Sequence, residues 1–183
     1  MVEYIEADMR SLLARFLSVL NRIDNGLARA ETGVGLMILS ALIAVLSLQV
    51  AGRQLPGIFF PWTEEVSRFL FVWLAFLGTA LAVQRNAHVA IHFVADRMGP
   101  RLQLVLGLVV RMLVVAFALI MLIYGLRLCM STRMVSTVLR LPMWLPYAAI
   151  PLAGALIVVH GVIGMLRLLG GSVVSDNTVE TRH

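Results

Sequence analysis

The sequence contains no lysine and only one cysteine. All 15 basic residues are arginine, in a chain whose formal net charge is +5. With Cys129 as the lone thiol, the sequence excludes an internal disulfide and any cysteine-rich metal site. The arginines form no cluster interleaved with aromatic residues, as a nucleic-acid-binding surface would need. Their charge therefore bears on membrane orientation rather than on nucleic-acid binding.

The usual constellations of catalytic residues are also missing. The sequence offers no serine or cysteine nucleophile with a histidine base, and no glycine-rich loop for phosphate. It has no helix that carries two metal ligands beside a carboxylate. We therefore expect that the chain is not an enzyme.

Long apolar runs dominate what is present, with hydrophobic residues at 60% of the composition. A bilayer core about 30 Å thick needs roughly 20 apolar residues in a helix. Four runs approach or exceed this length, and only Arg68 and Arg111 place charge within them. The runs cover residues 33–51, 66–83, 102–126 and 144–166. They predict one all-α integral membrane protein with four transmembrane helices, since a β-barrel would show short alternating strands.

An amphipathic pattern precedes the first run. Apolar residues recur there at steps of three and four, with arginines and serines on the other side. The apolar positions are Met9, Leu12, Leu13, Phe16, Leu17, Leu20, Ile23 and Leu27. This pattern predicts an interfacial helix within a cytoplasmic segment 1–31, although a soluble helix packed on the protein's own loops is an alternative. The membrane domain would then cover 32–168, followed by a disordered cytoplasmic tail at 169–183.

Arginines outside the apolar runs predict the orientation in the membrane. The N-terminal segment, the 84–101 connection and the C-terminal tail hold nine of them, and the other face holds four. The nine are Arg10, Arg15, Arg22, Arg29, Arg85, Arg97, Arg101, Arg167 and Arg182; the four are Arg53, Arg127, Arg133 and Arg140. Both termini should therefore be cytoplasmic, with Cys129 near the outer end of the third span.

Three ionisable residues mark the start of the second span. Pro61 and Thr63 suit a helix start, and Glu64 and Glu65 then fall in the first turn, where the helix dipole favours carboxylates. Arg68 follows Glu64 by four residues, at pairing distance on a helix. We expect an ion-pair cluster of Glu64, Glu65 and Arg68 that supports assembly, with an ion or proton site as the alternative.

Histidines offer a rival interpretation, because haem can be held between membrane helices. His88 and His92 follow the second span, whereas His160 lies well inside the fourth, so no pair is held at equal depth. We therefore expect His160 to be hydrogen-bonded within a helix interface rather than to bind haem. Arg111 is expected to snorkel to the cytoplasmic interface.

Taken in order along the four spans, three motifs resemble the small membrane (DctQ-like) subunit of tripartite ATP-independent periplasmic (TRAP) transporters. The resemblance covers residues 32–168. Its carriers are Trp62, Glu64, Glu65, Arg68, Trp73, Gly78, Arg85, His88, Val89, Ile91, Leu141, Pro142, Trp144, Tyr147, Pro151 and Gly154. The family often has an aspartate soon after the histidine stretch, and here Asp96 lies further on.

This resemblance implies a complex in the bacterial inner membrane. A much larger subunit would carry the sodium and substrate sites and move the substrate by an elevator motion. A periplasmic binding protein would deliver a carboxylate, such as sialic acid or a C4-dicarboxylate, or a sulfonate. The small subunit would be a scaffold without a cofactor of its own.

In such a scaffold, Trp73, Gly78 and His160 are expected at helix interfaces. The outer-loop residues Arg133 and Arg140 are candidates for docking the binding protein. The alternatives are a haem-bearing anchor of a redox complex and a stand-alone small transporter.

Overall fold

The computed structural model describes residues 2–54, 60–86 and 100–180. Within these ranges the chain forms α1 (Val2–Gln54), α2 (Pro61–Asn86), α4 (Pro100–Ser131), α5 (Trp144–Tyr147) and α6 (Ala149–Glu180). The only β-type pairing among the described residues is an isolated bridge between Val135 and Pro142. His88, His92 and Asp96 lie outside the described residues.

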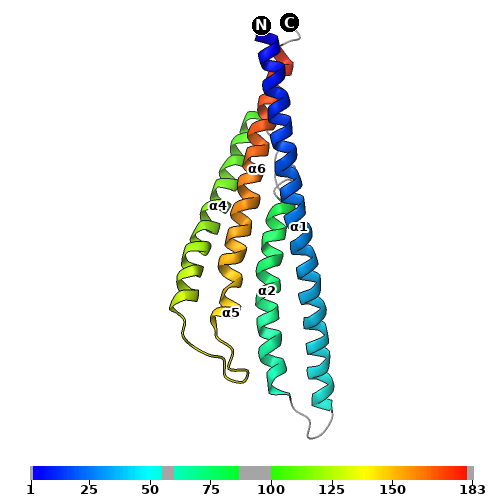
Figure 1. The fold of residues 1–183 in the computed structure, drawn as a ribbon, viewed down its shortest axis with the longest axis vertical. Coiled ribbons are helices and arrows are strands. Elements are labelled where there is room, and N and C mark those ends of the chain that lie inside the picture. Colours follow the sequence, from blue (N-terminus) through cyan, green and yellow to red (C-terminus); the bar gives the residue numbers. More distant parts are fainter. Residues whose placement is uncertain (1, 55–59, 87–99, 181–183) are drawn as a thin grey trace.

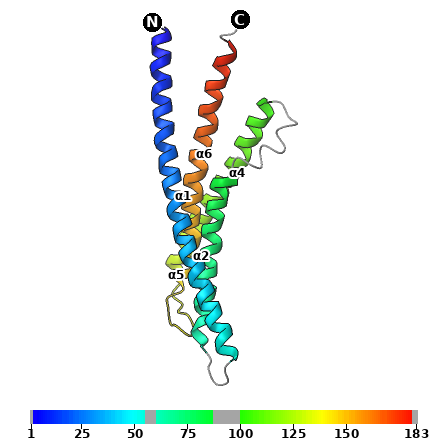
Figure 2. The same ribbon diagram turned by 90° about the vertical axis from the view of Figure 1, so that its right-hand side faces the viewer.

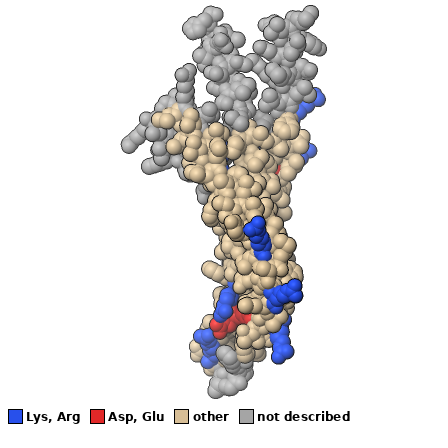
Figure 3. Space-filling view, turned by 90° about the vertical axis from the view of Figure 1, so that its left-hand side faces the viewer, with Lys and Arg blue, Asp and Glu red and all other residues tan. Residues whose placement is uncertain are grey.

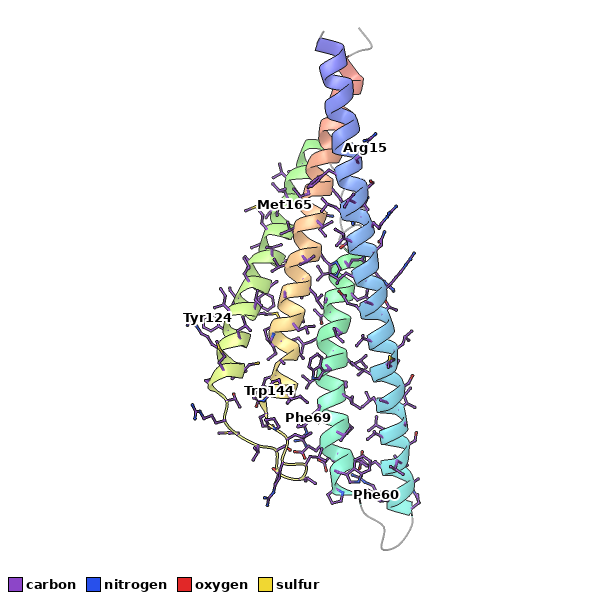
Figure 4. The ribbon with its side chains drawn as sticks, in the orientation of Figure 1. Arg15, Phe60, Phe69, Tyr124, Trp144 and Met165 are labelled. Atoms are coloured by element: carbon purple, nitrogen blue, oxygen red, sulfur yellow. The ribbon has the colours of Figure 1, made fainter. Side chains whose placement is uncertain are left out.

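The four spans expected from the sequence are confirmed. Four helical segments are long and apolar enough to cross a membrane: Ser18–Gln54, Pro61–Arg85, Val105–Ser131 and Trp144–Arg167. The fold is that of an all-α membrane protein, and much of its apolar surface faces outward. Tyr124, for example, points away from the other helices on the outer side of α4 and is 63% exposed (Figure 4).

α1 differs from the sequence expectation at residue 31. The amphipathic segment and the first span form one helix of 53 residues, with no break between them. The stretch contains Gly26, Gly33 and Gly35 but no proline, and glycine lowers helix propensity by only about 1 kcal/mol. Once the long apolar run is helical, adding residues to this existing helix is favourable, so the helix extends through the amphipathic segment.

The spans follow one another in the order α4, α6, α2, α1 across the molecule (Figure 1). α2 packs against α1 and α6, while α4 packs against α6 and the short α5. α1 also contacts α6, and beyond this contact the two helices diverge toward the end where both termini lie (Figure 2). Among the described helices, α4 contacts neither α1 nor α2.

α4 and α6 approach each other closely where side chains are small. A Cβ on Gly154 would lie 2.9 Å from the carbonyl oxygen of Ala118 and 2.9 Å from the amide nitrogen of Leu122. Ala118 and Ile157 are buried nearby, together with Ala80 of α2. Close approach through small residues is how membrane helices gain contact in the absence of a hydrophobic drive.

α6 also extends further than its sequence suggests. Residues 170–180, expected in a disordered tail, continue the helix to Glu180, and 181–183 lie outside the described residues. The sequence contains no proline after Pro151 to stop the helix.

Charged side chains occupy the two ends of the molecule more than its middle. On the face drawn in Figure 3, arginines and acidic residues gather toward the end opposite the termini, below a band that is almost entirely uncharged. This distribution suits a protein whose middle lies in lipid.

Candidate functional site

A buried charged cluster joins α1 to α6. His160 Nδ1 lies 2.5 Å from Asp24 Oδ1, and His160 Nε2 lies 2.8 Å from Glu31 Oε1. The side chains of His160, Asp24 and Glu31 are only 1%, 2% and 4% exposed. Arg167 donates from Nη2 to Asp24 Oδ2 at 2.5 Å and is itself partly exposed. We call these four residues the α1–α6 cluster.

Helix periodicity explains how the cluster forms. Asp24 and Glu31 are seven residues apart on α1, and His160 and Arg167 are seven apart on α6, so each pair lies on one face, two turns apart. The helices run in opposite directions at this contact (Figure 1). Asp24 therefore meets both His160 and Arg167, while Glu31 meets His160.

The sequence contained a signal for this cluster that its apolar pattern obscured. Asp24 and Glu31 continue the stripe of Leu20 and Leu27 at steps of four, three and four residues. Two carboxylates on an otherwise apolar stripe indicate a partner of opposite charge or a hydrogen-bond donor. Their partners, 129 to 143 residues away, were not visible from spacing.

Arg111 of α4 lies against α6 at Gly164, four residues after His160 and three before Arg167 of the cluster. Arg111 is 5% exposed. A Cβ on Gly164 would lie 3.0 Å from the Nη1 atom of Arg111. The guanidinium thus lies against α6 rather than extending to the membrane surface, contrary to the snorkelling expected from the sequence. The lack of a side chain at Gly164 provides the space for it.

His160 is poorly suited to bind haem in this arrangement. Both of its ring nitrogens lie at hydrogen-bonding distance from carboxyl oxygens. A haem ligand needs one ring nitrogen free for iron. No group of three or more metal-ligating side chains suited to a metal ion occurs in the described part of the chain.

At the start of α2, the two adjacent glutamates have different partners. Arg68 Nη2 donates to Glu64 Oε1 at 3.1 Å in an ion pair whose side chains are 68% and 59% exposed. Glu65 Oε2 accepts hydrogen bonds from the backbone N–H groups of Val138 and Leu139, at 3.3 and 2.8 Å. Glu65 therefore ties the connection between α4 and α5 to α2 and is not part of the ion pair.

That connection, residues 132–143, has an ordered backbone and carries Arg133 and Arg140. The Ser136 N–H donates to the Leu141 carbonyl at 2.8 Å, and the Met143 N–H donates to the Met134 carbonyl at 2.9 Å. Both arginines are exposed at the end opposite the termini. Arg140 has φ 52, in the left-handed region.

The remaining motif residues have mainly local structural roles. Pro142 forms the bridge with Val135. Trp144 is the first residue of α5 and Tyr147 is the last, and Pro151 is buried in the first turn of α6. A Cβ on Gly125 of α4 would lie 2.8 Å from the Pro151 side chain. The 141–151 motif therefore builds the turn that returns the chain to α6.

An exposed stripe runs along the side of α2 that faces away from its neighbours. It includes the Glu64–Arg68 pair and continues through small residues at steps of three and four. We call it the outer face of α2; its members are Glu64, Arg68, Phe71, Ala75, Gly78, Thr79, Ala82 and Arg85. A Cβ on Gly78 would meet nothing within 4 Å, so Gly78 forms no close contact within the chain. Trp73 is half-buried.

Comparison with known families gives a specific match to residues 42–171. The matching model describes the DctQ component of tripartite ATP-independent periplasmic transporters. The chain belongs to this family. The match includes all of α2, α4 and α5 and most of α6.

Individual relatives agree with this assignment. The chain is 36% identical over 110 residues to the sialic acid TRAP transporter small permease protein SiaQ of Vibrio cholerae, covering 59% of this chain and 62% of that protein. It is 32% identical over 149 residues to the C4-dicarboxylate TRAP transporter small permease protein DctQ of Rhodobacter capsulatus, covering 77% of this chain and 63% of that protein.

A third relative is a much longer protein. The isethionate TRAP transporter permease protein DctMQ of Oleidesulfovibrio alaskensis is 26% identical over 117 residues, which is 61% of this chain but 18% of that protein. Asp24 and Glu31 lie before the residues that match the family model. The α1 half of the α1–α6 cluster is therefore outside the part of the chain by which the family is recognised.

Proposed function

We propose that this TRAP small subunit acts as a scaffold for a larger permease subunit in the bacterial inner membrane, with both termini in the cytoplasm. The larger subunit would carry the sodium and substrate sites, and a periplasmic binding protein would deliver the substrate. The names of the relatives, which refer to sialic acid, isethionate and C4-dicarboxylates, support an organic acid as the substrate. The acid would be a carboxylate or a sulfonate.

The observation that carries the proposal is the arrangement of the spans. α1, α2 and α6 pack against one another, and α4 packs on α6 but not on α1 or α2, so the described spans do not close into a ring. Four helices packed in this way do not surround a passage for a solute. The charged groups at its centre are already paired within the α1–α6 cluster. These features support a second protein as the provider of the transport pathway.

The outer face of α2 is the surface best suited to that second protein. The Glu64–Arg68 pair is exposed within a membrane span, and charged groups there are costly unless a protein or water surrounds them. Ala75 and Gly78 would allow a partner helix to approach closely. The permease DctMQ, in which a stretch like this chain is a small part of a long protein, supports a large partner.

Co-purification tests this proposal. The chain, expressed together with a large TRAP permease subunit from the same bacterium, should retain that subunit through affinity purification in mild detergent. Ala75→Leu should reduce the recovered large subunit because the added side chain separates the helices. Arg68→Ala should also reduce it, by leaving Glu64 without its cation. Ala116→Leu, the same alanine-to-leucine change at an exposed position on α4, is the matched control and should leave recovery unchanged.

Three outcomes would contradict the proposal or a part of it. If no large permease subunit is recovered with the unchanged chain, the scaffold function is wrong. If Ala75→Leu and Ala116→Leu behave alike, the outer face of α2 is not the contact surface. If Arg68→Ala leaves the complex intact and changes the sodium dependence of uptake, the carboxylates belong to an ion site.

A further inference from the structure

The contacts of His160 in the α1–α6 cluster need more protons than a neutral histidine and two ionised carboxylates carry. A neutral imidazole carries one N–H donor, and an ionised carboxylate carries none. His160 nevertheless meets a carboxyl oxygen at both ring nitrogens, at 2.5 and 2.8 Å. With one proton, one of these contacts would place two lone pairs against each other. The geometry therefore requires a second proton.

We propose that Asp24, Glu31 and His160 form a proton-binding site, in which an exchangeable proton lies between His160 and Glu31. Asp24 is held as an anion by Arg167, which donates to its second oxygen. Among the residues that the structure describes, Glu31 makes no ion pair with an arginine, and its Oε2 atom is buried without a hydrogen-bond partner. Because a buried anionic oxygen without a partner is costly, the proton is best placed on the Glu31 side of the ring.

The charges around the site agree with this assignment. α1 contributes Asp24 and Glu31, and α6 contributes Arg167. From α4, Arg111 lies against α6 and close enough to Arg167 for the two cations to repel. The two carboxylates favour proton binding, and the arginines oppose it.

Proton occupancy controls the charge of the contact. With the second proton present, the four residues of the α1–α6 cluster are neutral overall, whether the proton is on His160 or on Glu31. Without it, the cluster carries a net negative charge, and one contact loses its hydrogen bond. The contact between α1 and α6 is therefore strongest when the site is protonated and weakens as the pH rises.

Thermal unfolding at a series of pH values tests the proposal on the full chain in lipid nanodiscs. The unchanged chain should lose stability as the pH is raised far enough to remove the shared proton. In Glu31→Gln, an amide N–H replaces the exchangeable proton as the donor to His160, so this alkaline loss should disappear. Glu64→Gln, at an exposed carboxylate far from the cluster, should keep the loss. Identical pH profiles for Glu31→Gln and the unchanged chain would overturn the proposal.

Spectroscopy on the unchanged chain tests the proposal even if a variant does not fold. Nitrogen NMR of labelled histidines, assigned by comparison with His160→Gln, reports the protons on the ring. Infrared absorption reports protonated carboxyl groups. Near neutral pH we expect either a doubly protonated ring or a protonated carboxyl group. A singly protonated ring together with fully ionised carboxyl groups would overturn the proposal, whatever the outcome of the co-purification.

Discussion

Glu64 and Glu65 are neighbours in the sequence, yet they perform different tasks because helix geometry turns their side chains apart. Glu64 lies on the outer face of α2 with Arg68, where it is available to a partner. Glu65 points toward the 132–143 connection and accepts two backbone hydrogen bonds from it. Glu64 is therefore part of an exposed surface, and Glu65 positions the 132–143 connection.

Replacing Glu65 with alanine should loosen the 132–143 connection. The N–H groups of Val138 and Leu139 would lose a charged acceptor that also joins them to α2. Hydrogen exchange at these two amides should become faster. Glu64→Ala should leave their exchange unchanged, because Glu64 has no bond to the connection. Equal exchange in both variants would show that Glu65 does not hold the loop.

Arg133 and Arg140 give a prediction about delivery of the substrate. Both are exposed on the ordered connection, at the end predicted to be periplasmic, where they suit complementary charge on a binding protein. Reversing both charges in the reconstituted complex should reduce uptake at low binding-protein concentration, with partial recovery at high concentration. Arg127→Glu, at an exposed arginine on α4, is the control. Unchanged uptake at every concentration would exclude the two arginines from docking.

Residue contacts differ in how far the sequence could predict them. The approach of Arg68 to Glu64 depends only on a spacing of four residues on a helix. The contacts of Glu65 with Leu139, and of His160 with Asp24, join residues more than 70 positions apart. Such contacts depend on how helices pack, which a single sequence does not specify.

At the scale of elements, two glycines on neighbouring helices face very different surroundings. Gly154 of α6 is pressed against the backbone of α4, whereas Gly78 of α2 faces open space. Both lie within membrane spans of the same chain. They form a matched pair for separating internal packing from contact with a partner.

Gly154→Leu should destabilise the isolated chain by about 1–3 kcal/mol or more, the usual cost of overpacking, because α4 must move away. Gly78→Leu should leave the stability of the isolated chain nearly unchanged. Thermal unfolding in nanodiscs measures both. Equal destabilisation by the two changes would contradict the described contact between α4 and α6.

The elements themselves were largely predictable, because continuous apolar runs of the required length have few other stable states in a membrane. The continuity of α1 was not predicted. An arginine-rich amphipathic pattern describes which sides of a helix differ in polarity, but not whether that helix bends before the next segment. The carboxylates of the α1–α6 cluster were overlooked because they lie on the apolar stripe that includes Leu20 and Leu27, which obscured them.

At the scale of the whole molecule, the four spans place the termini at one end and the 132–143 connection at the other (Figure 1). The arginine distribution predicts that the terminal end is cytoplasmic. Cysteines introduced at Ser131 and Ser18, in a chain in which Cys129 is replaced by serine, test this. In intact cells with a permeabilised outer membrane, an impermeant thiol reagent should label position 131 only, and label position 18 after lysis. The reverse pattern would invert the orientation.

Uptake into liposomes tests the central claim, that this small subunit supports transport without providing the pathway. Labelled sialic acid, isethionate and succinate should each be offered, with a sodium gradient, to liposomes holding the chain alone or the chain with its large subunit and binding protein. We predict no uptake of any acid by the chain alone, and sodium-dependent uptake of at least one by the full system. Uptake by the chain alone would contradict the account.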